Sequence, residues 1–283
     1  MRPPGLSKSR LLAHQQCPRR LWLQTYRPEL AEETGVARLA AGEHVGEVAR
    51  RLYPDGVLID GEDLGQALRD TQHGLQQPPR PLFEATVESD GVLIRADLLL
   101  PEGGAWRAVE VKSATRVKEY HLTDAAVQSW VLQHSGLPIS RIEIAHIDRD
   151  FVYAGGGDYH SLFRHVDVTE TTHDLRTQVP DWVNAARRTL TGADPQTPPG
   201  PQCHDPFDCP FLDHCVPPID DAVIPPEILP WGGRLAAALR AEGYQDLRDV
   251  PADRLSNRRH QRVWQAARDD QPVLDAEART TLA

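Results

Sequence analysis

Apolar and polar residues alternate with a period of two through the middle of the chain, over residues 82–89, 92–100 and 106–114. This period is typical of strands that bury one face. Asp90-Gly91 separates the first two runs, and a loop containing Gly103-Gly104 separates the last two. Both dipeptides are strong signals for two-residue hairpin turns. The sequence therefore predicts three consecutive antiparallel strands.

Helical periodicity surrounds these three strands. Apolar residues recur at helical spacing within 7–53 and 62–77 before the strands, and within 123–134 and 182–190 after them. One further strand is predicted over 141–147, where another apolar run follows a Gly and Pro break. This mixture predicts an α/β fold with a mixed sheet flanked by helices.

Proline-rich linkers divide the second half of the chain. One linker covers 193–201, and another follows the last cysteine and contains four prolines, the first of which is Pro217. The residues beyond it have the pattern of a small helical appendage. We therefore predict a main domain over 1–219 and a helical appendage over 220–283.

The composition excludes several classes of protein. With 40% hydrophobic and 25% charged residues, the chain can bury a real core and is neither disordered nor collagenous. Its longest apolar runs are strand-length, well short of the roughly 20 residues that span a membrane. The N-terminus also lacks the apolar region of a signal peptide. We expect a cytoplasmic protein with no membrane partner.

The charge of the chain is unevenly distributed. A formal net charge of -10 argues against a nucleic-acid partner, because phosphate binding requires clustered basic residues. Residues 1–28, however, contain six basic residues and no acidic one. This segment therefore predicts a local basic strip. Its candidate nucleic-acid-binding residues are Lys8, Arg10, Arg19 and Arg20.

Three carboxylates align when the strands are paired outward from their two turns. Glu84 then lies opposite Asp97, and Asp97 lies opposite Glu110. Like charges in directly opposed positions repel one another and destabilise a sheet. Lys112 follows Glu110 on the same face, and it is one of only three lysines in the chain. The other face of the middle strand is predicted to be a core surface of Val92, Ile94, Ala96, Leu98 and Leu100.

This acidic row has two interpretations. One is a solvated sheet face with scattered charges, which is the ordinary explanation for any single acid in a strand. The other is a site for Mg²⁺ or Mn²⁺, which prefer hard oxygen ligands and would cancel the repulsion. The register of three acids, together with a rare lysine, favours the metal site. A lysine beside the metal can orient an attacking water or offset charge on a phosphate.

Asp97 in Arg95-Ala96-Asp97, followed by Glu110-Val111-Lys112, resembles the D…E-x-K signature of the PD-(D/E)xK nuclease superfamily. No proline precedes Asp97 here. The resemblance implies a restriction-endonuclease-like core, in which Asp97, Glu110 and the Val111 carbonyl hold Mg²⁺ or Mn²⁺. Lys112 would act on the nucleophilic water. Glu84 is added to the metal candidates from the register alone.

The RecB-like branch of this superfamily adds an upstream helical histidine and a downstream helical glutamine. His44 and Gln128 occupy the matching places. The resemblance implies that His44 is a further metal ligand and that Gln128 positions the active site. For His44 alone, an ordinary helical histidine is the simpler interpretation, and only the whole pattern favours the ligand.

The four cysteines suggest a second metal centre. Cys17 stands alone, while Cys203, Cys209 and Cys215 form a C-x5-C-x5-C cluster. Without a secretion signal, so few cysteines indicate a metal site or buried thiols. Their order resembles the iron-sulfur branch of these nucleases, which includes CRISPR-associated exonucleases and the AddB nuclease domain and typically has C-x2-C-x5-C. The resemblance implies a 4Fe-4S cluster; the alternatives are zinc, with His204 or His214 replacing a thiolate, and unligated thiols.

Together these features predict a metal-dependent DNA nuclease, an exonuclease acting on single-stranded ends, with a 4Fe-4S cluster. By resemblance, a helicase or another nucleic-acid-processing protein is the expected partner. The competing hypothesis is a non-catalytic nucleic-acid-binding or assembly module that retains the fold. In the appendage, Ile228-Leu229-Pro230-Trp231-Gly232-Gly233 resembles a degenerate helix-hairpin-helix, a motif whose amides contact DNA phosphates.

Overall fold

A computed structural model describes residues 5–32, 36–61, 63–216, 223–271 and 273, and its fold is mixed α/β. The chain divides into two compact units. The first comprises Met1–Pro28 and Glu33–Pro195, and the second comprises Glu29–Glu32 and Gln196–Ala283. The predicted boundary at 219/220 lies outside the described residues. Because the structural division falls earlier, the three C-terminal cysteines belong to the second unit.

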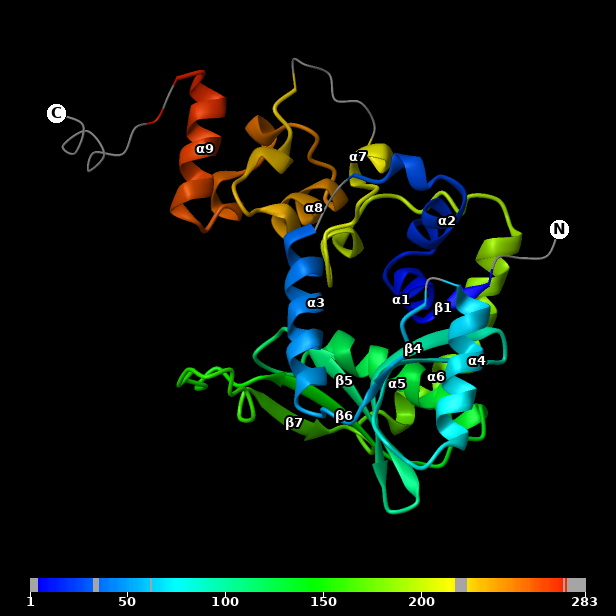
Figure 1. The fold of residues 1–283 in the computed structure, drawn as a ribbon. Coiled ribbons are helices and arrows are strands. Elements are labelled where there is room, and N and C mark those ends of the chain that lie inside the picture. The colour runs from blue at the N-terminus through cyan, green and yellow to red at the C-terminus, as the bar shows by residue number, and fades with distance from the viewer. Residues whose placement is uncertain (1–4, 33–35, 62, 217–222, 272, 274–283) are drawn as a thin grey trace. The chain divides into compact units, whose positions relative to one another are not determined.

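The first unit is built on a mixed sheet, which has seven strands in the described part of the chain (Figure 1). Its order is β2-β3-β4-β5-β6-β7, and β1 also pairs with β4. The β3–β4, β4–β5 and β6–β7 pairs are antiparallel, whereas the β1–β4, β2–β3 and β5–β6 pairs are parallel. The strands are β1 (Leu6–Ser7), β2 (Val57–Leu58), β3 (Leu82–Ser89), β4 (Val92–Glu102), β5 (Ala105–Lys112), β6 (Ile139–Ile147) and β7 (Phe163–Asp167).

The predicted three-strand meander is confirmed in its strands, its turns and its register. Asp90-Gly91 and Gly103-Gly104 form the two turns, and all four residues have positive φ. Positive φ is the backbone conformation that glycine adopts without steric cost. The pairs Phe83–Leu98 and Leu98–Val109 have the offsets that follow from these turns. The alignment of Glu84, Asp97 and Glu110 therefore starts from a correct register.

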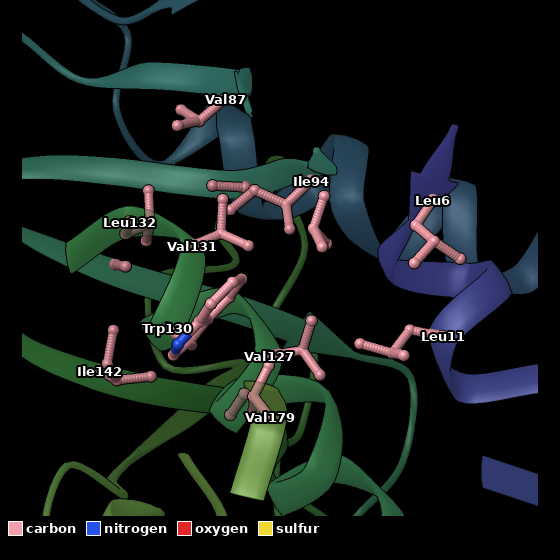
Figure 2. Packing of buried hydrophobic residues seen from close by; sticks show 14 of the residues in the cluster. Leu6, Leu11, Val87, Ile94, Val127, Trp130, Val131, Leu132, Ile142 and Val179 are labelled. Carbon is pink, nitrogen blue, oxygen red and sulfur yellow. The ribbon is translucent and has the colours of Figure 1, made fainter. Parts of the chain in front are cut away.

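Helices cover both faces of the sheet. They are α1 (Lys8–Gln16), α2 (Pro18–Tyr26), α3 (Val36–Arg51), α4 (Leu64–Gln76), α5 (Glu119–His134) and α6 (His173–Thr191). The larger apolar cluster joins one face to α5, α6 and the N-terminal segment, and Figure 2 shows Val127, Trp130 and Val131 of α5 packed there with Ile94. A smaller cluster joins Ala49 of α3 to Phe83 and Leu98 on the other face. Two separate cores thus fix the sheet.

The middle strands change faces within their length, which corrects one prediction. Val92, Ile94 and Ala96 pack into the larger cluster, but Leu98 and Leu100 pack into the smaller one. The five residues therefore do not share one core surface. The cause lies at Glu84, whose φ of 54 is in the left-handed region and interrupts the alternation of side chains along β3. The ladder passes directly from Phe83–Leu98 to Ala85–Ala96, so Glu84 and Asp97 lie at the crossing point.

The second unit is helical and has a core of its own. Its helices are α7 (Leu212–Cys215), α8 (Gly233–Ala241) and α9 (Arg258–Asp269), with short 3-10 turns at Pro201–Cys203, Pro226–Ile228, Leu247–Asp249 and Ala252–Arg254. Leu229, Leu239 and Trp264 are among its buried core residues. This organisation agrees with the predicted helical appendage. Throughout the described residues, every helix is too short or too polar to span a bilayer.

Candidate functional site

The candidate site lies where β5, α5 and the start of α1 meet. Glu110 and Lys112 alternate with inward-packed Val109 and Val111 near the end of β5. Asp124 and Gln128 are four residues apart on α5, so they share one face of that helix. β1 pairs with the beginning of β4, and α1 starts at Lys8, directly after β1. The Ser7 hydroxyl caps α1 by accepting a hydrogen bond of 3.3 Å from the Arg10 amide.

Two lysines and two carboxylates in this site form a closed ring of alternating charge, the ion-pair ring. Lys8 Nζ lies 2.9 Å from Glu110 Oε2 and 2.8 Å from Asp124 Oδ1. Lys112 Nζ lies 2.7 Å from Glu110 Oε1 and 2.5 Å from Asp124 Oδ2. The carboxylate side chains are nearly buried, at 5% and 9% exposure, while the lysines retain 16% and 20%. Both carboxylates are therefore held by the same two ammonium groups.

Asp97 lies beside the ion-pair ring and contacts the backbone of β5. Its Oδ2 accepts a hydrogen bond of 2.7 Å from the Val111 amide. This contact places the Asp97 carboxylate beside Glu110 on the face where the register predicts it. The predicted trio of Asp97, Glu110 and Lys112 is therefore brought together, and the Val111 backbone is directly involved.

Burial and the neighbouring charges shift the pKa values of the three carboxylates in different directions. Burial raises the pKa of Glu110 to about 7, and the neighbouring Asp124 and Asp97 add to this effect, although both lysines oppose it. Burial also raises the pKa of Asp97, against the opposing effect of Lys8 and Lys112. In Asp124 the two lysines outweigh burial and hold the pKa below its usual range.

Glu84 lies at the edge of this group. Its side chain forms an ion pair of 3.3 Å with Arg50 of α3. Burial raises the pKa of Glu84, Arg50 opposes this rise, and Glu110 adds to it. A left-handed glutamate inside a strand is a strained conformation of the kind that clusters at functional sites. Glu84 therefore remains a candidate, although its direct partner is an arginine.

His44 is exposed on α3, whereas Glu110 is buried. The role of His44 as a metal ligand stays a prediction. Within the ranges that the structure describes, no group of three or more His, Cys, Asp or Glu side chains has the arrangement of a metal site. At the predicted site, the Glu110 carboxylate is paired with the Lys8 and Lys112 ammonium groups.

Gln128 and His121 complete the buried polar layer of α5. Gln128 is fully buried, and its Oε1 accepts a hydrogen bond of 3.1 Å from Lys8 Nζ. Its Nε2 is one of the few buried side-chain donors in the described residues that has no hydrogen-bond partner. His121, one turn before Asp124, accepts a hydrogen bond from the Lys118 amide at 3.2 Å. Burial and the Lys112 charge lower the pKa of His121 to about 4, which keeps its ring neutral.

Several basic side chains of the predicted strip make contacts within the first unit. Lys8 is in the ion-pair ring and not on an open surface. Arg19 forms an ion pair of 3.1 Å with Asp194, which lies far along the chain. Arg20 contacts Gln16, and Arg10 donates to the Gly5 carbonyl at 2.7 Å. An acid-free stretch of sequence has thus acquired acidic partners on folding, and Arg10 and Arg20 remain its candidate nucleic-acid contacts.

The cysteines are distributed over both units. Cys17 joins α1 to α2 in the first unit, and none of the four cysteines forms a disulfide within the described residues. In the second unit, the Cys209 amide donates to the Cys203 carbonyl at 2.7 Å, and Cys215 ends α7. The Gly200 amide donates to the Cys203 sulfur at 3.5 Å. Amide donation to sulfur is one of the contacts that tune thiolate-bound clusters.

Comparison with known proteins adds little. No protein-family model and no curated protein matches the chain. Among solved structures, one match is titled "Crystal structure of SSO0001", at 13% sequence identity and a TM-score of 0.33, covering 63% of this chain and 75% of that chain. A likeness of this size bears on no functional question. The residues of the site carry the argument alone.

Asp124 and the position of Lys8 are the two site features that sequence reasoning missed. Asp124 precedes Gln128 by one helical turn, so the helix that presents the glutamine also presents the acid. The sequence does single out Lys8, because it is one of three lysines and directly follows Ser7, the N-cap of α1. Neither signal says which side chains will meet, because the two residues are more than a hundred positions apart.

Proposed function

We propose that the protein is a metal-dependent nuclease that hydrolyses phosphodiester bonds in DNA and acts on single-stranded ends. One observation carries the proposal. The structure gathers Asp97, Glu110 and Lys112 beside a fully buried glutamine whose amide donor has no hydrogen-bond partner in the described residues. Unsatisfied buried donors are rare, and a phosphate oxygen is an acceptor that would satisfy this one.

The proposed ligands of Mg²⁺ or Mn²⁺ are oxygen atoms, and the cation would have to replace the lysine contacts that Glu110 now makes. Asp97, Glu110 and the Val111 carbonyl offer hard oxygen ligands of the type that these cations prefer. Burial raises the pKa values of Asp97 and Glu110, although Lys8 and Lys112 oppose the rise. A bound divalent cation would place further positive charge beside these carboxylates and lower the pKa of an attacking water. Glu84 is a weaker ligand candidate because it forms an ion pair with Arg50. His44 is a weaker candidate because it is exposed on α3.

The protein's own groups would perform four tasks. Lys112, held by Glu110 and Asp124, keeps a fixed ammonium group beside the carboxylates, where it orients water and offsets charge that develops on phosphate. Gln128 presents its amide to the substrate from a rigid buried helix. Asp124 holds both lysines in place and is a positioning residue. Arg10 and Arg20 are candidates to guide a single strand toward the site.

A non-catalytic nucleic-acid-binding or assembly module is the second candidate function. The closure of the ion-pair ring favours it, because Glu110 has both oxygens already occupied by ammonium groups. A retired nuclease could neutralise its carboxylates in this way. A measurement of DNA hydrolysis distinguishes the two functions.

The purified protein is expected to degrade single-stranded DNA when Mn²⁺ or Mg²⁺ is present and to stop when a chelator is added. Glu110→Gln should lose this activity, because it removes a ligand charge while preserving the side-chain volume. Gel analysis of end-labelled oligonucleotides measures both results and distinguishes stepwise shortening from internal cuts. Persistent binding of DNA without cleavage, under every metal condition, would establish the non-catalytic module instead.

The four cysteines are proposed to hold a 4Fe-4S cluster. Protein purified without oxygen should be brown, absorb broadly near 400 nm as iron-sulfur proteins do, and contain about four iron and four sulfide per chain. Cys203→Ser should lose most of this iron, because the proposed cluster would lose one of its four thiolate ligands. A colourless protein with one zinc would contradict the cluster while leaving the nuclease proposal intact. A helicase or another nucleic-acid-processing protein is the partner proposed for such an enzyme.

A further inference from the structure

The ammonium group of Lys8 makes all of its polar contacts with residues of the candidate site. Its Nζ lies 2.9 and 3.0 Å from the two Glu110 oxygens, 2.8 Å from Asp124 Oδ1 and 3.1 Å from Gln128 Oε1. The side chain is only 16% exposed. An ammonium group has three donors and no acceptor, so these contacts exhaust it. Lys8 is therefore built into the site and is not a surface lysine that happens to lie close.

The position of Lys8 conflicts with that of a metal ion. A cation ligated by Glu110 would face the Lys8 charge a few ångströms away, and like charges at such distances repel strongly where water is scarce. Asp124 and Gln128 would still retain the ammonium group, because neither is among the proposed metal ligands. Lys112 has no such contact with Gln128, and it contacts Glu110 through one oxygen only.

We propose that Lys8 is an internal counter-ion that competes with Mg²⁺ or Mn²⁺ for Glu110 and so weakens metal binding at the candidate site. The inference deepens the proposed function, on which it rests for the presence of a divalent cation. Metal entry would require the Lys8 ammonium to leave Glu110, and Asp124 and Gln128 would keep it within the site. The incoming phosphate is then a new anionic partner for it.

The Gln128 side chain that accepts from Lys8 also carries a donor without a hydrogen-bond partner in the described residues. Gln128 Oε1 accepts from Lys8, and this contact turns Nε2 toward a place where no described residue accepts from it. A glutamine whose oxygen holds a lysine and whose nitrogen is unsatisfied suits a bound anion, which would accept from both Nε2 and the displaced ammonium. The same residue thus indicates both where Lys8 is stored and where a phosphate oxygen would bind.

Calorimetric titration of Mn²⁺ into the full-length protein, without DNA, tests the inference separately from catalysis. Lys8→Met should bind Mn²⁺ about tenfold or more tightly than the wild type, because a positive charge beside the ligand is removed. Lys8→Gln, which also loses the charge but keeps a polar end, should tighten binding as well. Lys8→Arg keeps the charge and should bind as weakly as the wild type. Lys118→Met removes an exposed lysine and should change nothing.

Thermal melting gives a second readout. In chelator, Lys8→Met should melt below the wild type, because Glu110 and Asp124 lose a counter-ion; Mn²⁺ should then raise its melting temperature more than that of the wild type. Equal or weaker Mn²⁺ binding by both uncharged variants overturns the inference and leaves the nuclease proposal standing. Tight binding by Lys8→Arg overturns it too, since charge would not be the cause. Absence of Mn²⁺ binding in every variant overturns both the inference and the metal part of the proposed function.

Discussion

Lys112→Met is expected to reduce DNA hydrolysis by about 10²- to 10⁴-fold, the range found when a group acting on a proton or on transition-state charge is removed. Lys112 lies 2.7 Å from Glu110 and 2.5 Å from Asp124, so no other cation can replace it without movement. Lys8 remains as a partner for both carboxylates and should keep the sheet folded. Initial rates on a single-stranded oligonucleotide with saturating Mn²⁺ measure the loss.

Lys118→Met is the matched control for this experiment. The chain has only three lysines, and Lys118 is the one that lies exposed, outside the ion-pair ring. It should retain full activity. Circular dichroism must show that Lys112→Met has kept its secondary structure. A folded Lys112→Met protein with the activity of the Lys118→Met control would refute the assigned role of Lys112.

Asp124→Asn is expected to have the largest effect on stability, about 3 kcal/mol or more in the free energy of unfolding. The substitution leaves Lys8 and Lys112 to share one carboxylate in a site that is almost closed to solvent. Removing one partner from a buried charge network typically costs about 3–5 kcal/mol, because the remaining charges stay buried without compensation. Urea unfolding at neutral pH, followed by circular dichroism, measures the difference.

The pH dependence of this effect has a definite sign. Lys8 and Lys112 hold the pKa of Asp124 below its usual value of 3.8, despite burial. A group whose pKa is lowered by folding stabilises the folded state above its unfolded pKa, and it loses that contribution as the pH falls toward its folded pKa. The stabilisation that the Asp124 carboxylate itself contributes should therefore be present above about pH 4 and be lost only in strong acid, where the gap between wild type and Asp124→Asn should shrink.

Asp181→Asn provides the comparison for Asp124→Asn. Asp181 is an exposed aspartate on α6, so the same chemical change there should alter the free energy of unfolding by less than about 0.5 kcal/mol. If the two variants unfold at the same urea concentration, the ion-pair ring does not stabilise the protein. The role of Asp124 as a positioning residue would then have no support.

The central meander could be predicted from sequence because its information is local. Each hairpin turn lies between two alternating runs, and the turn fixes the register of both strands. The helices over 62–77 and 123–134 were identified within a few residues of α4 and α5 for a similar reason. β1, β2 and β7 were missed, because strands of two to five residues have no period long enough to detect.

The face reversal at Glu84 could not be predicted from the pattern. A left-handed backbone at a glutamate has no compositional signal, since glycine is the residue expected there. Leu98, Leu99 and Leu100 are all buried, so hydrophobicity cannot show which core each one enters. Only the packing of α3 on the second face separates them.

Charge pairing was the least predictable feature of the site. The first 28 residues contain six basic residues and no acid, which suggested a surface for DNA. In the structure, Lys8 and Arg19 have acidic partners from later in the chain. Local charge counts cannot anticipate such pairs, because the partners meet only after the N-terminal helices have packed on α5 and α6.

The ion-pair ring also has a kinetic consequence. Lys8 and Glu110 are 102 positions apart, so their contact closes one of the longer loops in the first unit. Non-local contacts form slowly, because the entropy of loop closure must be lost before the contact stabilises the chain. The meander and α5 can form first, and the docking of the N-terminal segment then completes the site. A chain emerging from the ribosome therefore carries Lys8 long before its partners exist, and the ion-pair ring can close only after those partners have been synthesised.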